Sequence, residues 1–263
     1  ECGDYGYYFA KGANVPHSDT TPETLRALHM ALYEKSDTTD ANNSPLPPVF
    51  TYLGQFIDHD ITGQGVTRPE DAKIVEILDG DFSPQPRDAV AGAIKNARSG
   101  RLDLDSLYGP TKTTGNTAHD KLIGLMRFHG DRAKMWLAKP VEVGTGIPGE
   151  LPKDGAADLL RLGRLMVAQN GETTPRFSQA DFDALPDQIR GNFLTPDGEV
   201  NMRAAVIGDP RNDENLFVAQ LHLAFLRYHN RMVDAFPKKR NTGDEDQVFD
   251  WARDQVRLHY QWL

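Results

Sequence analysis

The sequence predicts a mainly α-helical fold whose helices are joined by long irregular connections. Strand signals are few, whereas apolar residues recur at helical spacing in several segments. The strongest of these segments is ENLFVAQLHLAFLRYHNRMVDAF, residues 214–236. It has two adjacent apolar stripes, one made by Leu216, Ala219, Leu223, Leu226 and Val233, and one by Phe217, Leu221, Tyr228, Met232 and Phe236. An apolar surface that broad predicts a helix inside the fold.

Further helices are predicted along the rest of the chain. The pattern TPETLRALHMALYE predicts a helix over residues 21–34, and a pair of prolines begins a second predicted helix over residues 48–61. Residues 63–118 contain many Gly, Pro, Asp and Thr, so we expect a loop with one or two short elements. Later segments predict short helices or strands in 120–129 and 158–169, a turn and helix in 174–186, and a helix over 246–263.

Length and composition exclude several classes of protein. The 263 residues suffice for one large domain or two small ones. The net charge of −9 argues against a nucleic-acid partner, which would favour a basic patch. No apolar run is as long as a membrane span. Cys2 is the only cysteine, so no internal disulfide can form.

Both ends of the sequence carry an expectation about the natural polypeptide. The first residue is Glu1 and no signal peptide is visible, so we expect a processed, trimmed or recombinant N-terminus. The final helical pattern, VFDWARDQVRLHYQWL, has no stop signal, so we expect the natural polypeptide to continue beyond Leu263.

The stretch GQFIDHDITGQG places three ionisable groups side by side. On a helix, Gln55, Asp58 and His59 share a broad face because they are three and four residues apart. Asp60 then points to a different side. One face would thus carry an amide, a carboxylate and an imidazole. For an arbitrary Asp-His-Asp triplet, however, a capped and solvated helix end is the commoner explanation.

A second motif, SGRLDLDSLYG, alternates oxygen-bearing side chains. In an extended loop, Ser99, Asp103 and Asp105 can converge on one side. Oxygen ligands of this kind suit Ca²⁺, which takes roughly 6–8 of them. The spacing is not that of an EF-hand, and a solvated acidic turn is about as probable. Asp60 could supply the ligand that this loop lacks.

Two further motifs lie at and within the longest predicted helix. In GDPRNDEN, Arg211 and Glu214 are three residues apart at a helix start, where an ion-paired arginine beside favourable acidic residues is the plain explanation. The motif RYHNRMV contains His229, and His222 precedes it on the same predicted helix. For both histidines, polar pairing inside a helical bundle is favoured over a metal-ligand role.

Together, and in this order, the motifs resemble one family, the animal-type haem peroxidases of the peroxidase–cyclooxygenase superfamily, and more closely its bacterial members. The resemblance rests on TYLGQFIDHDIT, RLDLDSLYGP, IGDPRNDENLFVAQLHLAFLRYHNRMV and ARDQVRLHYQWL, which span residues 51–263. It implies that family's helical fold. It also implies a haem-dependent peroxidase that reduces hydrogen peroxide and oxidises a small donor, namely a halide, a phenol or a metal ion.

The resemblance assigns catalytic roles to three residues. His59 corresponds to the distal histidine, which takes a proton from hydrogen peroxide and returns it to the leaving oxygen. Arg211 corresponds to the arginine of the family's GDxR motif, which stabilises charge as the O–O bond breaks. Gln55 corresponds to the glutamine that orients the distal water or a halide.

The resemblance also assigns residues that hold the cofactors. Asp58 and Glu214 correspond to the two carboxylates that form ester bonds to haem. The methionine that forms a sulfonium link in one mammalian member is replaced by Asn215, so no such link is expected. The implied calcium site combines Asp60 with a loop, to which Arg101 contributes its backbone carbonyl. That loop supplies Ser99, Arg101, Asp103 and Asp105.

One part of the family pattern is missing. The proximal histidine, which is the axial iron ligand, and its asparagine partner lie beyond the end of this sequence in the family. The chain, residues 1–263, is therefore predicted to be the N-terminal, distal-side part of a single peroxidase domain. It would be completed by the remainder of the polypeptide or by a companion chain. Family analogy and calcium availability favour a location outside the cytoplasm.

Two other functions stay open on the sequence. A fatty-acid dioxygenase of the same superfamily needs a radical-bearing tyrosine near the proximal helix. A non-catalytic, calcium-stabilised structural or adhesive domain is disfavoured by the joint presence of Gln55, His59 and Arg211. The residues that follow Leu263 would discriminate among these functions.

Overall fold

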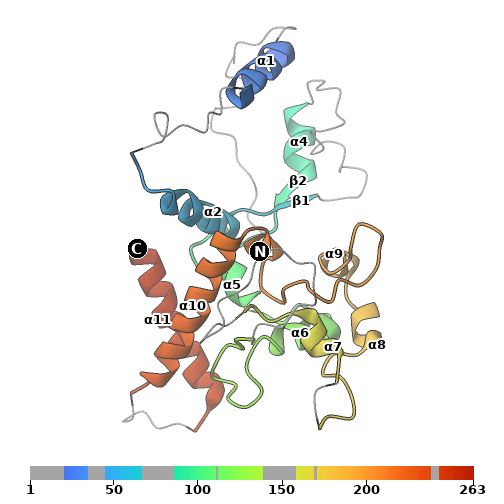
Figure 1. Cartoon of the computed structure of the whole chain (residues 1–263), viewed down its shortest axis with the longest axis vertical. Coiled ribbons are helices and arrows are strands. Elements are labelled where there is room, and N and C mark those ends of the chain that lie inside the picture. The colour runs from blue at the N-terminus through green and yellow to red at the C-terminus, as the bar shows by residue number, and fades with distance from the viewer. Residues whose placement is uncertain are drawn as a thin grey trace. The chain divides into compact units, whose positions relative to one another are not determined.

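The predicted helical class is confirmed by a computed structural model (Figure 1). It describes residues 21–34, 45–66, 86–110, 112–138, 158–168, 171–237 and 243–263, so that Cys2 lies outside the described residues. The helices of these ranges are α1 (Thr21–Glu34), α2 (Val49–Ile61), α4 (Arg87–Ala93), α5 (Asp105–Tyr108), α6 (Thr117–Gly124), α7 (Leu162–Met166), α8 (Gln179–Asp183), α9 (Asp187–Gly191), α10 (Leu216–Asp234) and α11 (Glu245–Trp262). A 3₁₀ helix, η3 (Pro210–Asp213), and two strands, β1 (Gln64–Val66) and β2 (Ile94–Asn96), complete them.

The chain divides into two compact units. The first contains residues 1–51 and 62–100, and the second contains residues 52–61 and 101–263. Helix α2 therefore passes from the first unit into the second. The prediction of a single domain stays a prediction. Among the described helices, none combines the length and the apolar character that crossing a bilayer requires.

The first unit contains more secondary structure than the sequence predicted. Strands β1 and β2 pair in antiparallel register, with Gln64 opposite Asn96 and Val66 opposite Ile94. The side chain of Asn96 accepts the backbone N–H groups of Gly63 at 2.9 Å and Arg98 at 3.1 Å. Among its described residues, the stretch predicted as a loop with one or two elements thus holds β1, α4 and β2 in this unit and α5 in the second unit. Strands of three residues are too short to show an alternating pattern.

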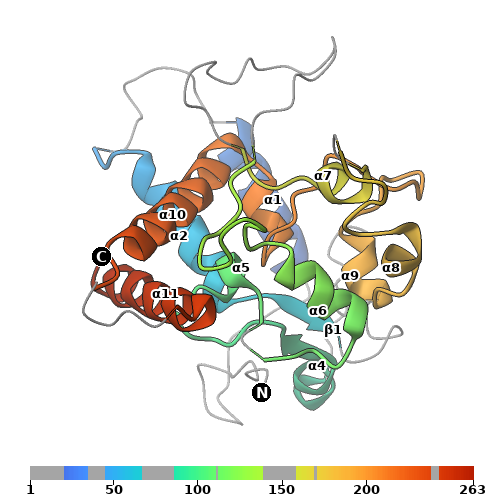
Figure 2. The same ribbon diagram turned by 90° about the horizontal axis from the view of Figure 1, so that it is seen from below.

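The core of the second unit forms where α10 and α11 pack side by side, as both views show (Figures 1 and 2). Three rings join them to α2. Phe56 of α2 is fully buried and stacks on Phe225 of α10 with ring centroids 5.1 Å apart. Tyr260 of α11 meets both rings edge-on, at 6.2 Å from Phe56 and 5.6 Å from Phe225. The ring cluster fixes the inner face of α2 against the two long helices.

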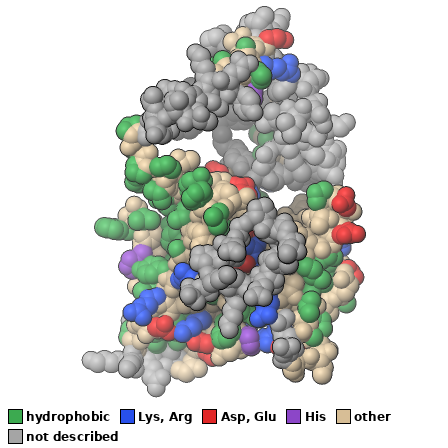
Figure 3. Space-filling view, in the orientation of Figure 1, with side chains coloured by type: hydrophobic (Ala, Val, Ile, Leu, Met, Phe, Trp, Pro, Cys, Tyr) green, Lys and Arg blue, Asp and Glu red, His purple; other side chains and the backbone are tan. Residues whose placement is uncertain are grey.

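Helix α10 is buried along a stripe that differs in part from the predicted one. Its buried residues are Val218, His222, Leu223, Leu226 and His229. Leu216 and Phe217, predicted as members of the apolar stripes, are 61% and 57% exposed. The first turn of α10 is therefore a surface feature. Hydrophobic side chains gather where α2 and this turn lie (Figure 3).

Candidate functional site

Helix α2 presents two different faces, as its residue spacing predicts. Phe56 and Asp60 are one turn apart, and both are 0% exposed. Gln55 is half-buried and Asp58 is exposed, so these two side chains lie on the outer side. His59 stands between the two sides and is 5% exposed. One short helix thus directs Asp60 into the fold and Gln55 and Asp58 outward.

The imidazole of His59 is held at one nitrogen. Its Nδ1 lies 2.9 Å from Oδ1 of Asn212, a fully buried residue of η3. Because an amide oxygen can only accept, His59 carries its proton on Nδ1 in this arrangement. Its Nε2 lies 3.7 Å from Oε1 of Glu214, whose side chain is 46% exposed. Nε2 therefore faces the outer edge of the site, towards Glu214.

Asn212 continues this contact to a second buried histidine. Its Nδ2 lies 3.1 Å from Nδ1 of His222, which is 0% exposed. Burial lowers the pKa of His222 to about 3, although the charge of Asp209 opposes this shift. His222 is therefore neutral at physiological pH, and it completes a buried row with His59 and Asn212. Asn212 was not predicted from the sequence, since one asparagine in a polar turn gives no periodic signal.

Arg211 is fixed by the acid two residues before it and by the backbone of α2. Asp209 caps η3 by accepting the backbone N–H of Arg211 at 2.9 Å, and its carboxylate also receives Nη2 at 2.7 Å. Nη2 additionally donates to the carbonyl oxygen of His59 at 3.2 Å. Partial burial lowers the pKa of Arg211, but the contacts with Asp209 and the charges of Asp58 and Glu214 raise it overall.

Gln55 and Glu214 meet at the outer edge of the site. Nε2 of Gln55 donates to Oε1 of Glu214, and Oε1 of Gln55 accepts Nδ2 of Asn215 at 3.3 Å. Asn215 also caps α10 by accepting the backbone N–H of Val218 at 3.0 Å. The structure thus brings together the five residues predicted for catalysis and haem attachment. They are Gln55, Asp58, His59, Arg211 and Glu214.

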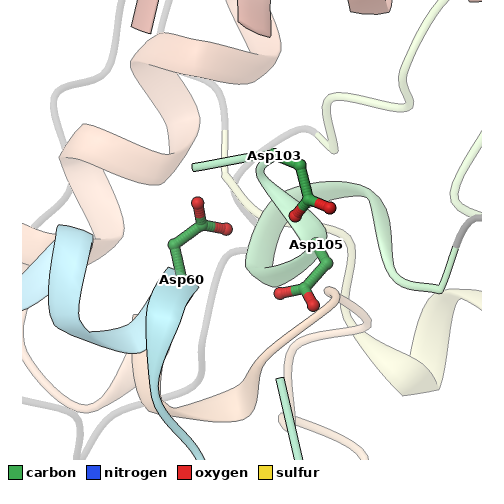
Figure 4. Close-up of side chains that lie close together, drawn as sticks. All are labelled: Asp60, Asp103 and Asp105. Carbon is green, nitrogen blue, oxygen red and sulfur yellow. The ribbon is translucent and has the colours of Figure 1, made fainter. Parts of the chain in front are cut away.

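A cluster of three carboxylates forms at the inner end of α2 (Figure 4). Asp60 of α2, Asp103 of the following loop and Asp105 at the start of α5 each offer an oxygen, and these oxygens lie within 4.8 Å of one another. The convergence does not come from an extended loop. Leu104, between the two loop acids, adopts a left-handed conformation with φ of 58°. Such a turn costs a non-glycine residue about 1–2 kcal/mol.

Asp60 is buried among hydrogen-bond donors from this loop. It accepts the backbone N–H of Leu104 at 3.1 Å, and the N–H and hydroxyl of Ser106 at 3.3 and 3.2 Å. Burial nevertheless raises the pKa of Asp60 to about 6, and the nearby charge of Asp105 adds to the rise. The hydrogen bonds alone therefore leave the carboxylate charge incompletely compensated.

Helix α11 and the segment before η3 hold the same loop from outside. Arg257 Nε donates to the carbonyl oxygen of Asp103, and Gln261 Nε2 donates to that of Leu102 at 2.7 Å. A Cβ added at Gly208 would lie 2.3 Å from the Asp105 carbonyl oxygen and 2.6 Å from that of Ser106. Gly208, in the GDPR motif, thus lets its backbone contact the start of α5 directly.

Two predicted calcium ligands stay predictions. Ser99 belongs to the first unit, whereas the carboxylate cluster belongs to the second. Arg101 lies in the second unit with its side chain exposed, in keeping with a role for its backbone rather than its guanidinium.

His229 pairs inside the bundle, as the sequence analysis favoured. Its Nδ1 lies 3.0 Å from the hydroxyl of Tyr108, and its Nε2 lies 2.9 Å from the carbonyl oxygen of Ala133. Burial lowers the pKa of His229 to about 4. Both nitrogens are thus occupied by contacts that tie α10 to α5 and to the turn after α6.

Comparison with models of known protein families finds a match in the C-terminal part of the chain. Residues 156–262 match the model of the animal haem peroxidase family, which confirms the resemblance at the level of that superfamily. The family implies haem binding, with hydrogen peroxide and a reductant as substrates. The matched part contains Arg211, Glu214, α10 and α11, whereas α2 and the loop carrying Asp103 and Asp105 lie outside it. No curated protein and no solved structure matches the chain.

Proposed function

We propose that the protein is a haem-dependent peroxidase that reduces hydrogen peroxide and oxidises a small donor, either a halide, a phenol or a metal ion. One observation carries the proposal. His59 has Nδ1 held by Asn212 and Nε2 directed to the outer edge, and its backbone carbonyl oxygen accepts a hydrogen bond from the guanidinium of Arg211. A fixed base and a fixed cation held in the same site suit the heterolysis of an O–O bond.

The chemistry of the outer edge supports the proposal of a bound porphyrin. Asp58 and Glu214 are exposed carboxylates whose charges both act on Arg211, and the exposed apolar side chains of Leu216 and Phe217 begin two residues after Glu214. Carboxylates can form esters with haem, and the apolar turn offers a surface for its ring. We propose ester bonds through Asp58 and Glu214. Acid–acetone treatment should then leave the haem on the chain, and free release of haem would contradict the ester bonds.

The proton transfers are assigned to His59. A bound haem would supply the redox chemistry for peroxide cleavage and donor oxidation. Nε2 of His59 accepts the proton of the attacking peroxide oxygen and then donates it to the departing one, so that water leaves. Nδ1 keeps its proton throughout because Oδ1 of Asn212 accepts it. Arg211 offers N–H groups to the oxygen that becomes negative.

Calcium is proposed for the carboxylate cluster. Three acids, one of them fully buried, converge there, and the charge of Asp60 is incompletely compensated by its donors. A divalent cation would compensate these charges with the oxygen ligands that Ca²⁺ prefers. Because Asp60 follows His59 on α2, the ion would also fix the helix that carries the catalytic base.

The axial ligand is proposed to come from another part of the enzyme. His222 and His229 are both fully buried on α10 and hold contacts with Asn212 and Tyr108. The proposal therefore includes a proximal histidine from the remainder of the polypeptide or from a companion chain. Haem-loaded His222→Gln and His229→Gln variants should keep the absorption spectrum of a histidine-ligated iron. Loss of that spectrum would contradict the assignment.

Replacement of His59 tests the proposed function directly. In haem-loaded protein, His59→Ala should slow the reaction with hydrogen peroxide by roughly 10²–10⁴-fold, measured by stopped-flow absorbance, with little loss of haem. His259→Ala is the matched control, since His259 is an exposed histidine on α11. An unchanged rate in His59→Ala would refute the proposed mechanism.

A further inference from the structure

The second unit contains a cavity of about 230 Å³ that none of the candidate-site residues lines. It is formed by the segment that follows α5, by the end of α6, by the 126–135 turn and by α11. We propose that this cavity binds a small organic anion with one aromatic ring and one carboxylate. Its volume lies below the roughly 300–1,000 Å³ of sites for drug-sized ligands, which limits the occupant to about one ring.

The apolar part of the lining suits a ring. Tyr108 and Phe249 are 7% and 8% exposed, and their centroids lie 6.0 Å apart at 81°. Met126 and Met135, which are 5% and 3% exposed, also line the cavity. Aromatic edges and thioether sulfurs both make favourable contacts with an aromatic ligand. These residues provide the site for the ring.

The charged part of the lining is mostly positive, in a chain whose net charge is −9. Asp120 is the one carboxylate on the lining, and it already accepts the backbone N–H and the hydroxyl of Thr114 at 2.7 and 2.8 Å. The lining also contains four cations, namely Lys112, Arg127, Arg132 and Arg253.

Two of these cations are paired with acids that lie outside the lining. Arg127 contacts Asp246 at 2.6 Å and Arg253 contacts Asp250 at 3.0 Å, and the two acid side chains are 74% and 59% exposed. Water screens such exposed charges, whereas the arginines are only 15% and 21% exposed. The positive charge on the cavity side is therefore weakly compensated.

The other two cations are available at the rim. Lys112 and Arg132 are exposed, and neither side chain forms an ion pair within the described part of the chain. The carboxylate of Glu245 accepts the backbone N–H of Arg132 at 3.1 Å, which leaves the guanidinium for a ligand. The apolar part of the lining suits the ring of a ligand, and the exposed cations suit its negative charge. Together they favour an anion with an apolar body. The proposal does not depend on haem binding.

Fluorine NMR with 4-fluorobenzoate tests the proposal on the full chain. We expect saturable line broadening, with 4-fluorobenzyl alcohol binding at least tenfold more weakly because it lacks the charge. Lys112→Ala and Arg132→Ala should each weaken binding by about fivefold, the scale of one exposed ion pair. Arg203→Ala, which removes an exposed cation that does not line the cavity, is the matched control and should leave binding unchanged.

A variant that fills the cavity tests whether the ligand binds there. Gly124 lines the cavity at the end of α6, and a Cβ there would meet no atom within 4 Å. Gly124→Leu should therefore abolish binding while circular dichroism shows an intact fold. Binding that survives this substitution would place the ligand elsewhere and overturn the proposal, as would the absence of saturable binding. Should Gly124→Leu unfold, an unchanged affinity in the Lys112→Ala, Arg132→Ala double variant would be equally decisive against it.

Discussion

Asn212 determines which nitrogen of His59 can act as a base. It is fully buried, it carries no charge, and its amide joins His59 to His222 at 2.9 and 3.1 Å. Without its oxygen, the imidazole could exchange tautomers and rotate, and Nε2 would no longer be a permanently free acceptor. In the proposed enzyme Asn212 is thus a positioning residue that acts through His59.

Replacement of Asn212 should impair the proton transfer without removing the base. We expect Asn212→Ala to slow the reaction with hydrogen peroxide by roughly 10-fold to 100-fold, less than the loss of His59 itself. The pH profile of that rate should shift as well, because the imidazole loses its buried acceptor. Leu226→Ala, at an equally buried position of α10, is the control for lost stability. A rate and pH profile equal to those of Leu226→Ala would show Asn212 to be merely structural.

The predictability of the site from sequence differs from residue to residue. Helical spacing alone indicated that Gln55, Asp58 and His59 share a side and that Asp60 leaves it. The partners of these residues could not be read in this way. Asn212 and Ser106 come from turns more than forty positions away from Asp60, and short polar turns have no period from which a direction can be inferred.

At the scale of the elements, Gly208, just before η3, contacts the start of α5 so closely that only glycine fits there. A side chain at position 208 would enter the space of the Asp105 and Ser106 carbonyl oxygens. We therefore expect Gly208→Ala to lower the free energy of unfolding by roughly 1–3 kcal/mol, measured by urea denaturation. Gly191→Ala is the control, since a Cβ there meets no atom within 4 Å. Equal stability of the two variants would contradict the close packing.

Calcium should stabilise the loop that carries Asp103 and leads into α5. Asp103→Asn removes one of the three converging carboxylates, so we expect a lower calcium content and a smaller rise in Tm when calcium is added. Removal of the ion with a chelator should also slow peroxide reduction, because Asp60 adjoins His59. Asp197→Asn, an exposed acid of another loop, is the control. Retained calcium and an unchanged Tm in Asp103→Asn would exclude the site.

Long and short elements differed in how far the sequence predicted them. Helices α1, α2, α10 and α11 extend over three turns or more, so their apolar spacing repeats often enough to be recognised. The β1–β2 pair depends on a partner strand some thirty residues away, which no local pattern records. The exposed turn at Leu216 and Phe217 was also missed, because periodicity marks an apolar face and not what covers it.

Across the whole molecule, two buried histidines should make stability depend on pH. Burial lowers the pKa of His222 to about 3 and that of His229 to about 4, from 6.5. The unfolded chain then binds more protons than the folded one between those values and about pH 6.5. The contribution of these two histidines to stability is therefore complete above that pH and falls as the pH drops, by up to about 1.4 kcal/mol per unit for each histidine.

Urea denaturation at about pH 7 and about pH 5 measures this dependence. His222→Gln should show a smaller loss between the two values than the wild-type chain, because its buried side chain no longer titrates. His259→Gln, at an exposed position, should lose as much as the wild type. An identical loss in all three proteins would assign the acid sensitivity to other groups.

The contact at Gly208 has a thermodynamic consequence for the enzyme. It joins the backbone that leads to Arg211 with the backbone that carries Asp105, while α2 joins His59 to Asp60. We expect two connections between one pair of proposed sites to couple their ligands energetically, and such coupling is reciprocal. In the proposed enzyme, whatever factor calcium adds to the affinity for cyanide at the haem, cyanide must add to the affinity for calcium. Calcium titrations with and without cyanide measure that factor, and a value of one would mean that the shared backbone transmits nothing.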